Sequence, residues 1–290
     1  MNIRLIKQAD IDKTKWNSCV HFATNGNVFG YRWFLDNIAK EWDALVEEDY
    51  ESVMPLIWRE NSDGQKEIYQ PSLIRESGIY SISLISAARL KAFLDKIPAE
   101  YSRINLHLNE GTNHRTDVDF SFEKKWNHQL LVNQSYEKLA ANYSDTLKEK
   151  LGQASDFQLR PSSAIKPEAV ADFFKANHPN PSSIEKKYHG SMRIMYNVLH
   201  RGWGFSSAIE NKQGDLLAAG FFIFSHGKIL TFLASENAEG KEKGALALLY
   251  DLLIRTNAGK PVLLDFNSKK EDAFPLGFGA EESFFYKICR

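Results

Sequence analysis

The chain has 290 residues, of which 43% are hydrophobic and 25% are charged, so it exceeds one ordinary domain and has the composition of a folded globular protein. Lys and Arg number 36 and Asp and Glu number 37, which gives a net charge of -1. This balance argues against a broad surface for a nucleic-acid backbone.

The first part of the chain alternates strands and helices. Residues 3–7 read as a strand, residues 9–19 as a helix, and residues 27–40 as a turn followed by an amphipathic helix, because their apolar side chains recur at helical spacing. The further elements that we expect are strands at 43–48, 52–58 and 67–70, a helix at 86–97, a strand at 104–108, a polar loop at 109–116 and a strand within 120–132.

A new helix, expected at residues 135–151 with Ser135 as its N-cap, begins the second part. We therefore predict two mixed α/β halves, residues 1–132 and residues 133–290. The second half is expected to contain a short strand at 157–161, helices at 167–177 and 184–200, strands at 204–210, 216–225 and 228–235, a polar loop, a helix at 245–255, a strand at 261–266, a short helix and a last strand at 283–289.

The segment after the strand at 228–235 is a candidate anion site. Gly240 and Gly244 lie in the expected loop, and Ala245 begins a leucine-rich helix. Small residues at a helix N-terminus expose backbone N–H groups that suit a pyrophosphate, and Lys241 and Lys243 add positive charge. The alternative is an ordinary polar loop that precedes a core helix.

This order of strand, Gly-containing loop, helix and strand resembles the C-terminal half of the GNAT acyltransferase fold. Short motifs along nearly the whole chain also resemble the FemAB-like proteins, which are tandem members of the acyl-CoA N-acyltransferase superfamily. The residues that carry this resemblance are Trp42, Leu45, Val46, Asp49, Tyr50, Pro55, Leu56, Gly244, Ala245, Leu264, Asp265, Phe266, Ser268, Phe278, Gly279 and Ala280.

The resemblance implies an α/β fold with mixed (α+β) sheets in two GNAT-like halves. The C-terminal half would hold acetyl-CoA or another acyl-CoA as co-substrate, with the pantetheine between two diverging strands and the pyrophosphate on the Gly-containing loop. The chain departs from the family pattern at Asn267, which directly precedes Ser268, and it lacks an obvious counterpart of the helical arm found in the tRNA-dependent branch.

Acyl transfer to an amine requires a route for the amine proton and donors for the developing oxyanion. Backbone N–H groups of Leu233, Ala234 and Ser235 are candidates for the second task. Glu236 is a candidate base, with a solvated loop carboxylate as the alternative. Tyr286 is a candidate acid for the leaving thiolate, with a core aromatic as the alternative.

We therefore expect an N-acyltransferase that moves an acyl group from acyl-CoA to a small amine or amino sugar. The alternatives are an aminoacyl-tRNA-dependent peptidoglycan aminoacyltransferase of the FemABX type and a non-catalytic binding module. Cys19 and Cys289 lack metal or redox spacing, and no metal motif occurs, so no metal is expected. Without a signal core or a membrane span, the chain is expected to be cytoplasmic. The acceptor and the oligomeric state stay open.

Overall fold

The computed structural model describes residues 1–112, 117–162 and 165–290. They divide into two compact units, of which the first comprises Met1–Trp126 with Ser283–Arg290 and the second comprises Asn127–Glu282. The last strand thus belongs to the first unit, although the sequence places it with residues 133–290. The reason is its pairing, because β13 (Glu281–Cys289) runs antiparallel to β6 (Tyr101–His107). The last four residues of the polar loop expected at 109–116 lie outside the described residues.

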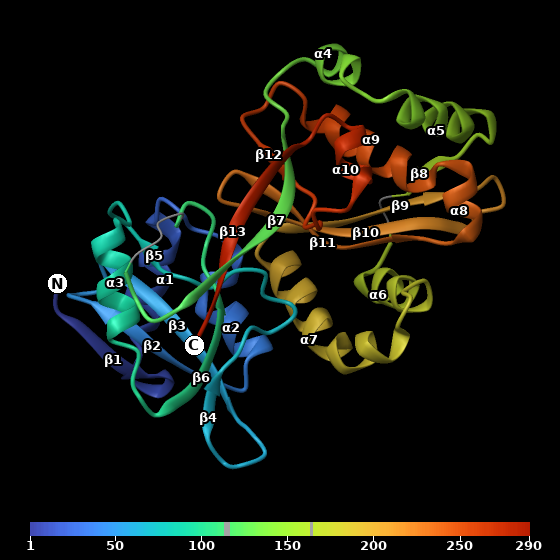
Figure 1. The fold of residues 1–290 in the computed structure, drawn as a ribbon. Helices are drawn as coiled ribbons and strands as arrows, with labels where there is room; N and C mark the ends of the chain where they lie inside the picture. Colours follow the sequence, from blue (N-terminus) through green and yellow to red (C-terminus); the bar gives the residue numbers. More distant parts are fainter. Residues whose placement is uncertain (113–116, 163–164) are drawn as a thin grey trace. The chain divides into compact units, whose positions relative to one another are not determined.

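The first unit is built on a mixed sheet with the strand order β1-β2-β3-β4-β6-β13, and β13 is followed by the first part of β7 (Figure 1). Its other elements are β1 (Ile3–Lys7), α1 (Lys13–Phe22), α2 (Arg32–Ile38), β2 (Glu41–Glu47), β3 (Ser52–Glu60), β4 (Lys66–Ile68), β5 (Tyr80–Ser81), α3 (Ala87–Asp95) and β7 (Ser121–Leu131), which continues into the second unit.

The central strands of this sheet are covered on both faces. Trp42 of β2 packs against Trp16 of α1, with ring centroids 5.1 Å apart, whereas its neighbour Leu45 lies in one apolar cluster with Leu90 and Phe93 of α3. Because successive side chains point to opposite faces of a strand, helices on both sides make β2 buried along nearly its whole length.

The second unit repeats the same plan. Its sheet has the order β8-β9-β10-β11-β12, with the last part of β7 beside β12. Its elements are α4 (Tyr136–Ala141), α5 (Asp145–Asp156), β8 (Arg160–Ser162), α6 (Pro167–Ala176), α7 (Pro181–His200), β9 (Gly204–Glu210), β10 (Leu216–Ser225), β11 (Lys228–Glu236), α8 (Ala238–Lys243), α9 (Ala245–Asn257), β12 (Leu263–Asp265) and α10 (Ala273–Gly277).

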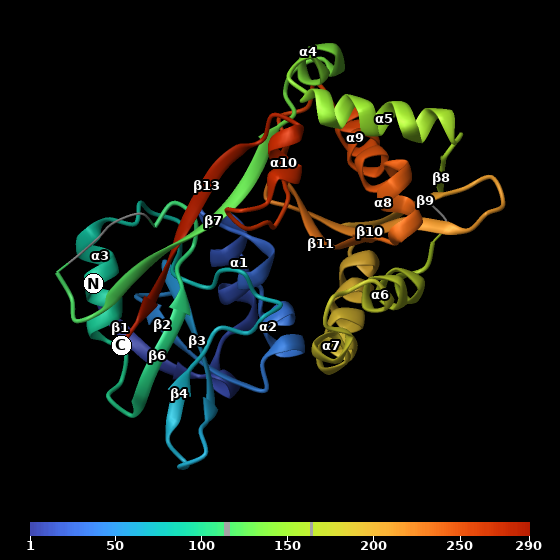
Figure 2. The ribbon, with the colours of Figure 1, turned by 45° about the vertical axis from the view of Figure 1, so that its right-hand side comes forward.

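Each unit therefore contains a strand, two helices, three antiparallel strands, one helix (α3) or two (α8 and α9), and a strand parallel to the third of the three. In the second unit, α9 covers one face of the sheet and α6 and α7 cover the other (Figure 2). This arrangement confirms the predicted mixed α/β fold in two similar halves.

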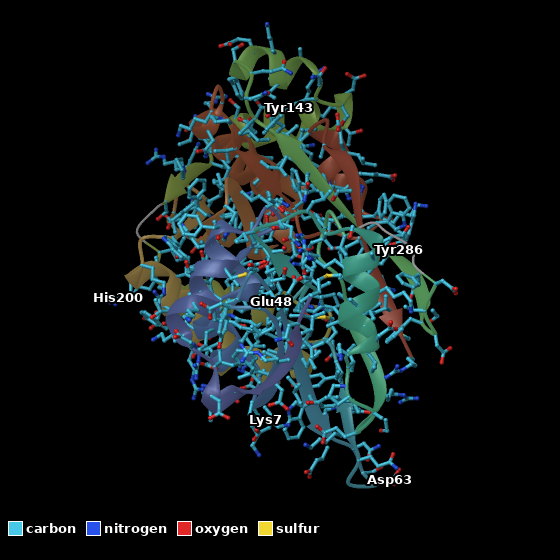
Figure 3. All side chains as sticks on the ribbon, turned by 90° about the vertical axis from the view of Figure 1, so that its left-hand side faces the viewer. Lys7, Glu48, Asp63, Tyr143, His200 and Tyr286 are labelled. Carbon is cyan, nitrogen blue, oxygen red and sulfur yellow. The ribbon has the colours of Figure 1, made fainter. Side chains whose placement is uncertain are left out.

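Two local predictions were wrong. The helix expected at residues 135–151 is two helices, because the chain turns at Tyr143 (Figure 3). The buried ring of Tyr143 packs on Phe278, and its hydroxyl donates to Asp251 at 3.0 Å. The polar loop expected before residue 245 is largely helical, since Asn237 caps α8 by accepting from the Gly240 N–H at 2.7 Å.

Candidate functional site

Strands β11 and β12 of the second unit pair only over a short stretch and then diverge. The parallel register runs from Lys228 opposite Leu263 to Leu230 opposite Asp265, where β12 ends, whereas β11 continues to Glu236. We call the opening between the two strands the splay. One side chain bridges its inner end, where the Asn267 Nδ2 donates to the Thr231 carbonyl at 3.1 Å.

A β-bulge changes which backbone groups of β11 face the splay. The carbonyl of Thr231 points toward β12, yet the N–H of Asn237, six residues later, donates to the Leu217 carbonyl of β10 at 3.1 Å. In a regular strand both would point the same way. The pairing with β10 skips Phe232, so the alternation shifts by one residue there. We infer that the Ala234 N–H faces the splay.

The splay contains a cavity of about 270 Å³, which we call the splay cavity. Tyr250 of α9 lies in its wall, donating to or accepting from the Thr231 hydroxyl at 3.0 Å and stacking on Phe266 with centroids 5.2 Å apart. Burial raises the pKa of Tyr250, so its hydroxyl stays protonated. The lining residues are Phe174, Thr231, Phe232, Leu233, Ala234, Leu246, Tyr250, Phe266, Asn267, Asp272, Phe274 and Pro275.

A second cavity, of about 510 Å³, lies beside the N-terminus of α9, and we call it the helix cavity. Helices α5, α9 and α10 supply most of its wall, which is largely apolar. Its charged residues are Lys150, Glu236 and Lys241. The remaining lining residues are Ser144, Thr146, Leu147, Gly244, Ala247, Ala273, Phe274, Leu276 and Gly277, so that Phe274 borders both cavities.

The two glycines of the expected anion loop are held by the fold itself. Gly240 lies inside α8, and a Cβ added there would lie 2.3 Å from the Leu217 carbonyl oxygen. Gly244 joins α8 to α9 in the left-handed region, with a φ of 74°, and an added Cβ would lie 2.2 Å from the Lys150 carbonyl oxygen. Gly244 is therefore buried under α5.

The two loop lysines have different surroundings. Lys243 pairs with Glu239 at 2.7 Å and lies over the ring of Phe157 at 4.8 Å. Lys241 lines the helix cavity, and its backbone carbonyl accepts from the Lys150 Nζ at 2.9 Å. Lys150 was missed by sequence reasoning, because it lies about 90 residues earlier on an ordinary charged helix face.

Glu236 lies at the end of β11 and reaches the start of α9, where its Oε2 accepts from the Leu246 N–H at 3.1 Å. Burial raises the pKa of this carboxyl, and the Leu246 N–H together with Lys150 and Lys241 opposes that rise. A carboxylate thus already occupies the helix N-terminus at which the sequence suggests a pyrophosphate. Ala245, the first residue of α9, is fully buried.

The other predicted residues divide between the two units. Leu233 lines the splay cavity. The Ser235 hydroxyl is buried and has no hydrogen-bond partner within the parts of the chain that the structure describes. Tyr286 lies in the apolar core of the first unit, packed edge-on against Phe122 (Figure 3), so it has the surroundings of a core aromatic. Tyr250 is the tyrosine that lines the splay cavity, and the leucine-rich pattern around it concealed this role.

Two general features accompany this site. Among the described residues, no His, Cys, Asp and Glu side chains gather in a group of three or more that could ligate a metal ion. Within the same residues, no helix has both the length and the apolarity needed to cross a membrane.

Comparison with known proteins identifies the fold. No protein-family model matches the chain, and no curated protein matches it in sequence. Among solved structures, FemX superposes with a TM-score of 0.66 at 10% identity, covering 99% of this chain and 97% of FemX. L-PGS from Bacillus licheniformis gives 0.54 at 10% identity, over 96% and 92% of the two chains. A tandem GNAT protein from the clavulanic acid biosynthesis pathway gives 0.50 at 11% identity, over 99% and 98%. The chain therefore has the tandem GNAT fold of FemAB-like proteins.

Proposed function

We propose that the chain is an N-acyltransferase that joins the acyl group of an activated donor to the amine of a small molecule or an amino sugar. The observation that carries this proposal is the splay of the second unit, where the bulge in β11 shifts the strand's alternation beside a cavity of about 270 Å³, so that we infer the Ala234 N–H to face this cavity. The acyl carbonyl would accept from this N–H, and the tandem GNAT fold supports the same reaction class.

The chemistry requires little from the side chains. The acceptor amine attacks the acyl carbonyl carbon, a C–N bond forms, and the carbonyl oxygen becomes an oxyanion that the Ala234 N–H stabilises. Collapse of this intermediate breaks the bond to the leaving thiolate or alkoxide. Tyr250 lines the same cavity and is our candidate for proton transfer to the leaving group. Glu236 is our candidate for accepting the proton of the amine, directly or through water.

Two donor classes fit the fold. Acetyl-CoA or another acyl-CoA is one, and the tandem GNAT neighbour is described as a structure without AcCoA. An aminoacyl ester carried by tRNA is the other. Glu236 bears on this choice, because its carboxylate occupies the N-terminus of α9 that would bind the pyrophosphate of CoA.

The test substitutes the backbone donor itself. Ala234→Pro removes the N–H that faces the splay, whereas Ala234→Gly keeps it and changes only the side chain. With amines as acceptors and acetyl-CoA, S-acetylpantetheine and aminoacyl-tRNA as donors, we expect amide formation by the native chain and a loss of about 100-fold or more in kcat for Ala234→Pro. Amide formation by no donor would leave a binding module as the better description, and equal activity of the folded proline variant would remove Ala234 from the mechanism.

A further inference from the structure

The N-terminus of α9 separates two cavities that face the same strand. Ala234 lines the splay cavity and Glu236 lines the helix cavity. Residues two apart on a strand point to the same face and lie about 7 Å apart. Phe274 borders both cavities as well. A single extended ligand that follows this strand past Phe274 would place its acyl end in the splay cavity and its following arm in the helix cavity.

The wall of the helix cavity sets the chemistry of that arm. Leu147, Ala247 and Leu276 offer apolar surface, and Leu276 is 46% exposed there. The Nζ of Lys150 donates to the backbone carbonyl of Lys241, so part of its hydrogen-bonding capacity is used within the chain. The arm thus meets apolar surface, and the charged groups of the wall are Glu236, Lys150 and Lys241.

Glu236 is the residue that an anionic arm would meet at the start of α9. Its carboxylate accepts from the Leu246 N–H, so a phosphate placed there would have to displace it or lie beside it. Two negative charges at close range in a half-buried site repel each other much more strongly than in water. Lys150 and Lys241 lower this repulsion. The Leu246 N–H nevertheless stays occupied, because it donates to the Glu236 carboxylate.

We infer that Glu236 selects the donor, because it excludes phosphate from the N-terminus of α9 and leaves the helix cavity to an uncharged, largely apolar arm. This inference rests on the proposed function for the identity of the ligand as an acyl donor. It differs from a purely structural role, in which Glu236 only stabilises the start of α9 by binding an exposed N–H.

Two thioesters with the same acyl group and the same pantetheine arm test the inference. Acetyl-CoA carries the pyrophosphate and the phosphorylated adenosine, whereas S-acetylpantetheine carries neither. Calorimetry of the full chain should show that S-acetylpantetheine binds at least as tightly as acetyl-CoA. Glu236→Gln keeps an oxygen that accepts from Leu246 and removes the charge, and we expect it to tighten acetyl-CoA binding about tenfold while leaving S-acetylpantetheine binding unchanged.

The controls separate selection from capping. Glu239→Gln removes a carboxylate that pairs with Lys243 on α8 and lines neither cavity, and it should change neither affinity. Leu276→Trp should weaken both thioesters, because it fills the helix cavity. If Glu236→Gln lowers the melting temperature without changing the ratio of the two dissociation constants, Glu236 is only a cap and the inference is wrong. Failure of the native chain to bind S-acetylpantetheine also overturns it.

These measurements report binding and not turnover. A chain that binds S-acetylpantetheine selectively but forms no amide would contradict the proposed function and support the selection by Glu236. A chain that forms amides but binds both thioesters equally in native and Glu236→Gln forms would do the reverse.

Discussion

The two units share one topology, but the gap between their parallel strands is filled by the chain in the first unit and contains a cavity in the second. In the first unit, β4 ends at Ile68 and the following chain folds back into the gap beside β6. There the Gln70 Oε1 accepts from the His107 N–H at 3.0 Å and from the Ser77 hydroxyl at 3.2 Å, and the His107 Nδ1 bonds to the Arg75 carbonyl at 2.7 Å. In the second unit, β11 runs past the end of β12 and leaves the gap to a cavity.

The shared fold is therefore not sufficient to make a binding site. The third antiparallel strand has 3 residues in the first unit and 9 in the second, and the longer one contains the bulge that turns Ala234 toward the gap. In the first unit, the equivalent polar groups are used by the chain itself. Our proposal therefore places donor binding in the second unit and gives the gap of the first a structural role.

The largest expected effect concerns Gly244, which lies against the Lys150 carbonyl of α5 in the second unit. Gly244→Ala should destabilise the chain by about 3 kcal/mol, because the new Cβ is strained at positive φ and also collides with the Lys150 carbonyl. Gly259 has a similar φ of 80° but open space around it, so Gly259→Ala should cost only about 1 kcal/mol. Denaturant unfolding of both variants gives the difference.

Similar losses in the free energy of unfolding for the two variants would mean that α5 shifts at little cost when a side chain is added at position 244. Lys150 would then not fix the start of α9. The absence of a side chain at Gly244 would instead be explained by the close approach of a ligand.

A smaller effect is expected in the first unit. Gln70→Ala leaves the His107 N–H and the Ser77 hydroxyl without their acceptor, which should cost about 1–3 kcal/mol in the free energy of unfolding. Gln65 is exposed in a turn, so Gln65→Ala is the matched control. Because we place the donor in the second unit, Gln70→Ala should leave the kcat for amide formation unchanged in the folded fraction. A loss of kcat without a loss of stability would show that the first gap takes part in the reaction.

Several strands of the second unit are predicted well from the sequence. The periodicities of residues 204–210 and 216–225 yield β9 and β10 with their actual bounds, because a buried strand and a tight turn at His226–Gly227 leave a local signal. The Gly-containing segment was located correctly as the start of a core helix. The close approach of Gly244 to the Lys150 carbonyl has no signal in this segment, since it depends on a helix about 90 residues earlier in the chain.

Other parts of the site leave no local signal. The bulge at Phe232 is a mismatch between two strands, and neither strand shows it alone. Tyr250 looks like one more apolar residue of α9 until Thr231 and Phe266 are placed beside it. Tyr286 was a reasonable candidate by residue type, but long-range pairing of β13 with β6 places it in the core of the first unit.

The smallest expected effect is a difference in pH dependence between the units. Burial lowers the pKa of His107 below its usual 6.5, and the Arg75 carbonyl opposes this. As pH falls through 6.5, the unfolded chain takes up the proton before the folded one, so the first unit loses stability on acidification. Burial raises the pKa of Glu236 above 4.5. As pH rises from 4.5, the unfolded chain releases its proton first, so this group makes the second unit less stable at higher pH.

Hydrogen exchange followed by mass spectrometry on the full chain reports the two units separately, after correction for the intrinsic pH dependence of exchange. Between pH 5 and pH 7, protection of β6 should rise and protection at the start of α9 should fall. His107→Asn, which keeps a donor for the Arg75 carbonyl, should flatten the first trend only, and Glu236→Gln the second only. His200 is exposed at the end of α7, so His200→Asn should change neither trend. Parallel trends in both units would mean that these two buried groups do not govern the pH response, and that their burial is relieved by water in solution.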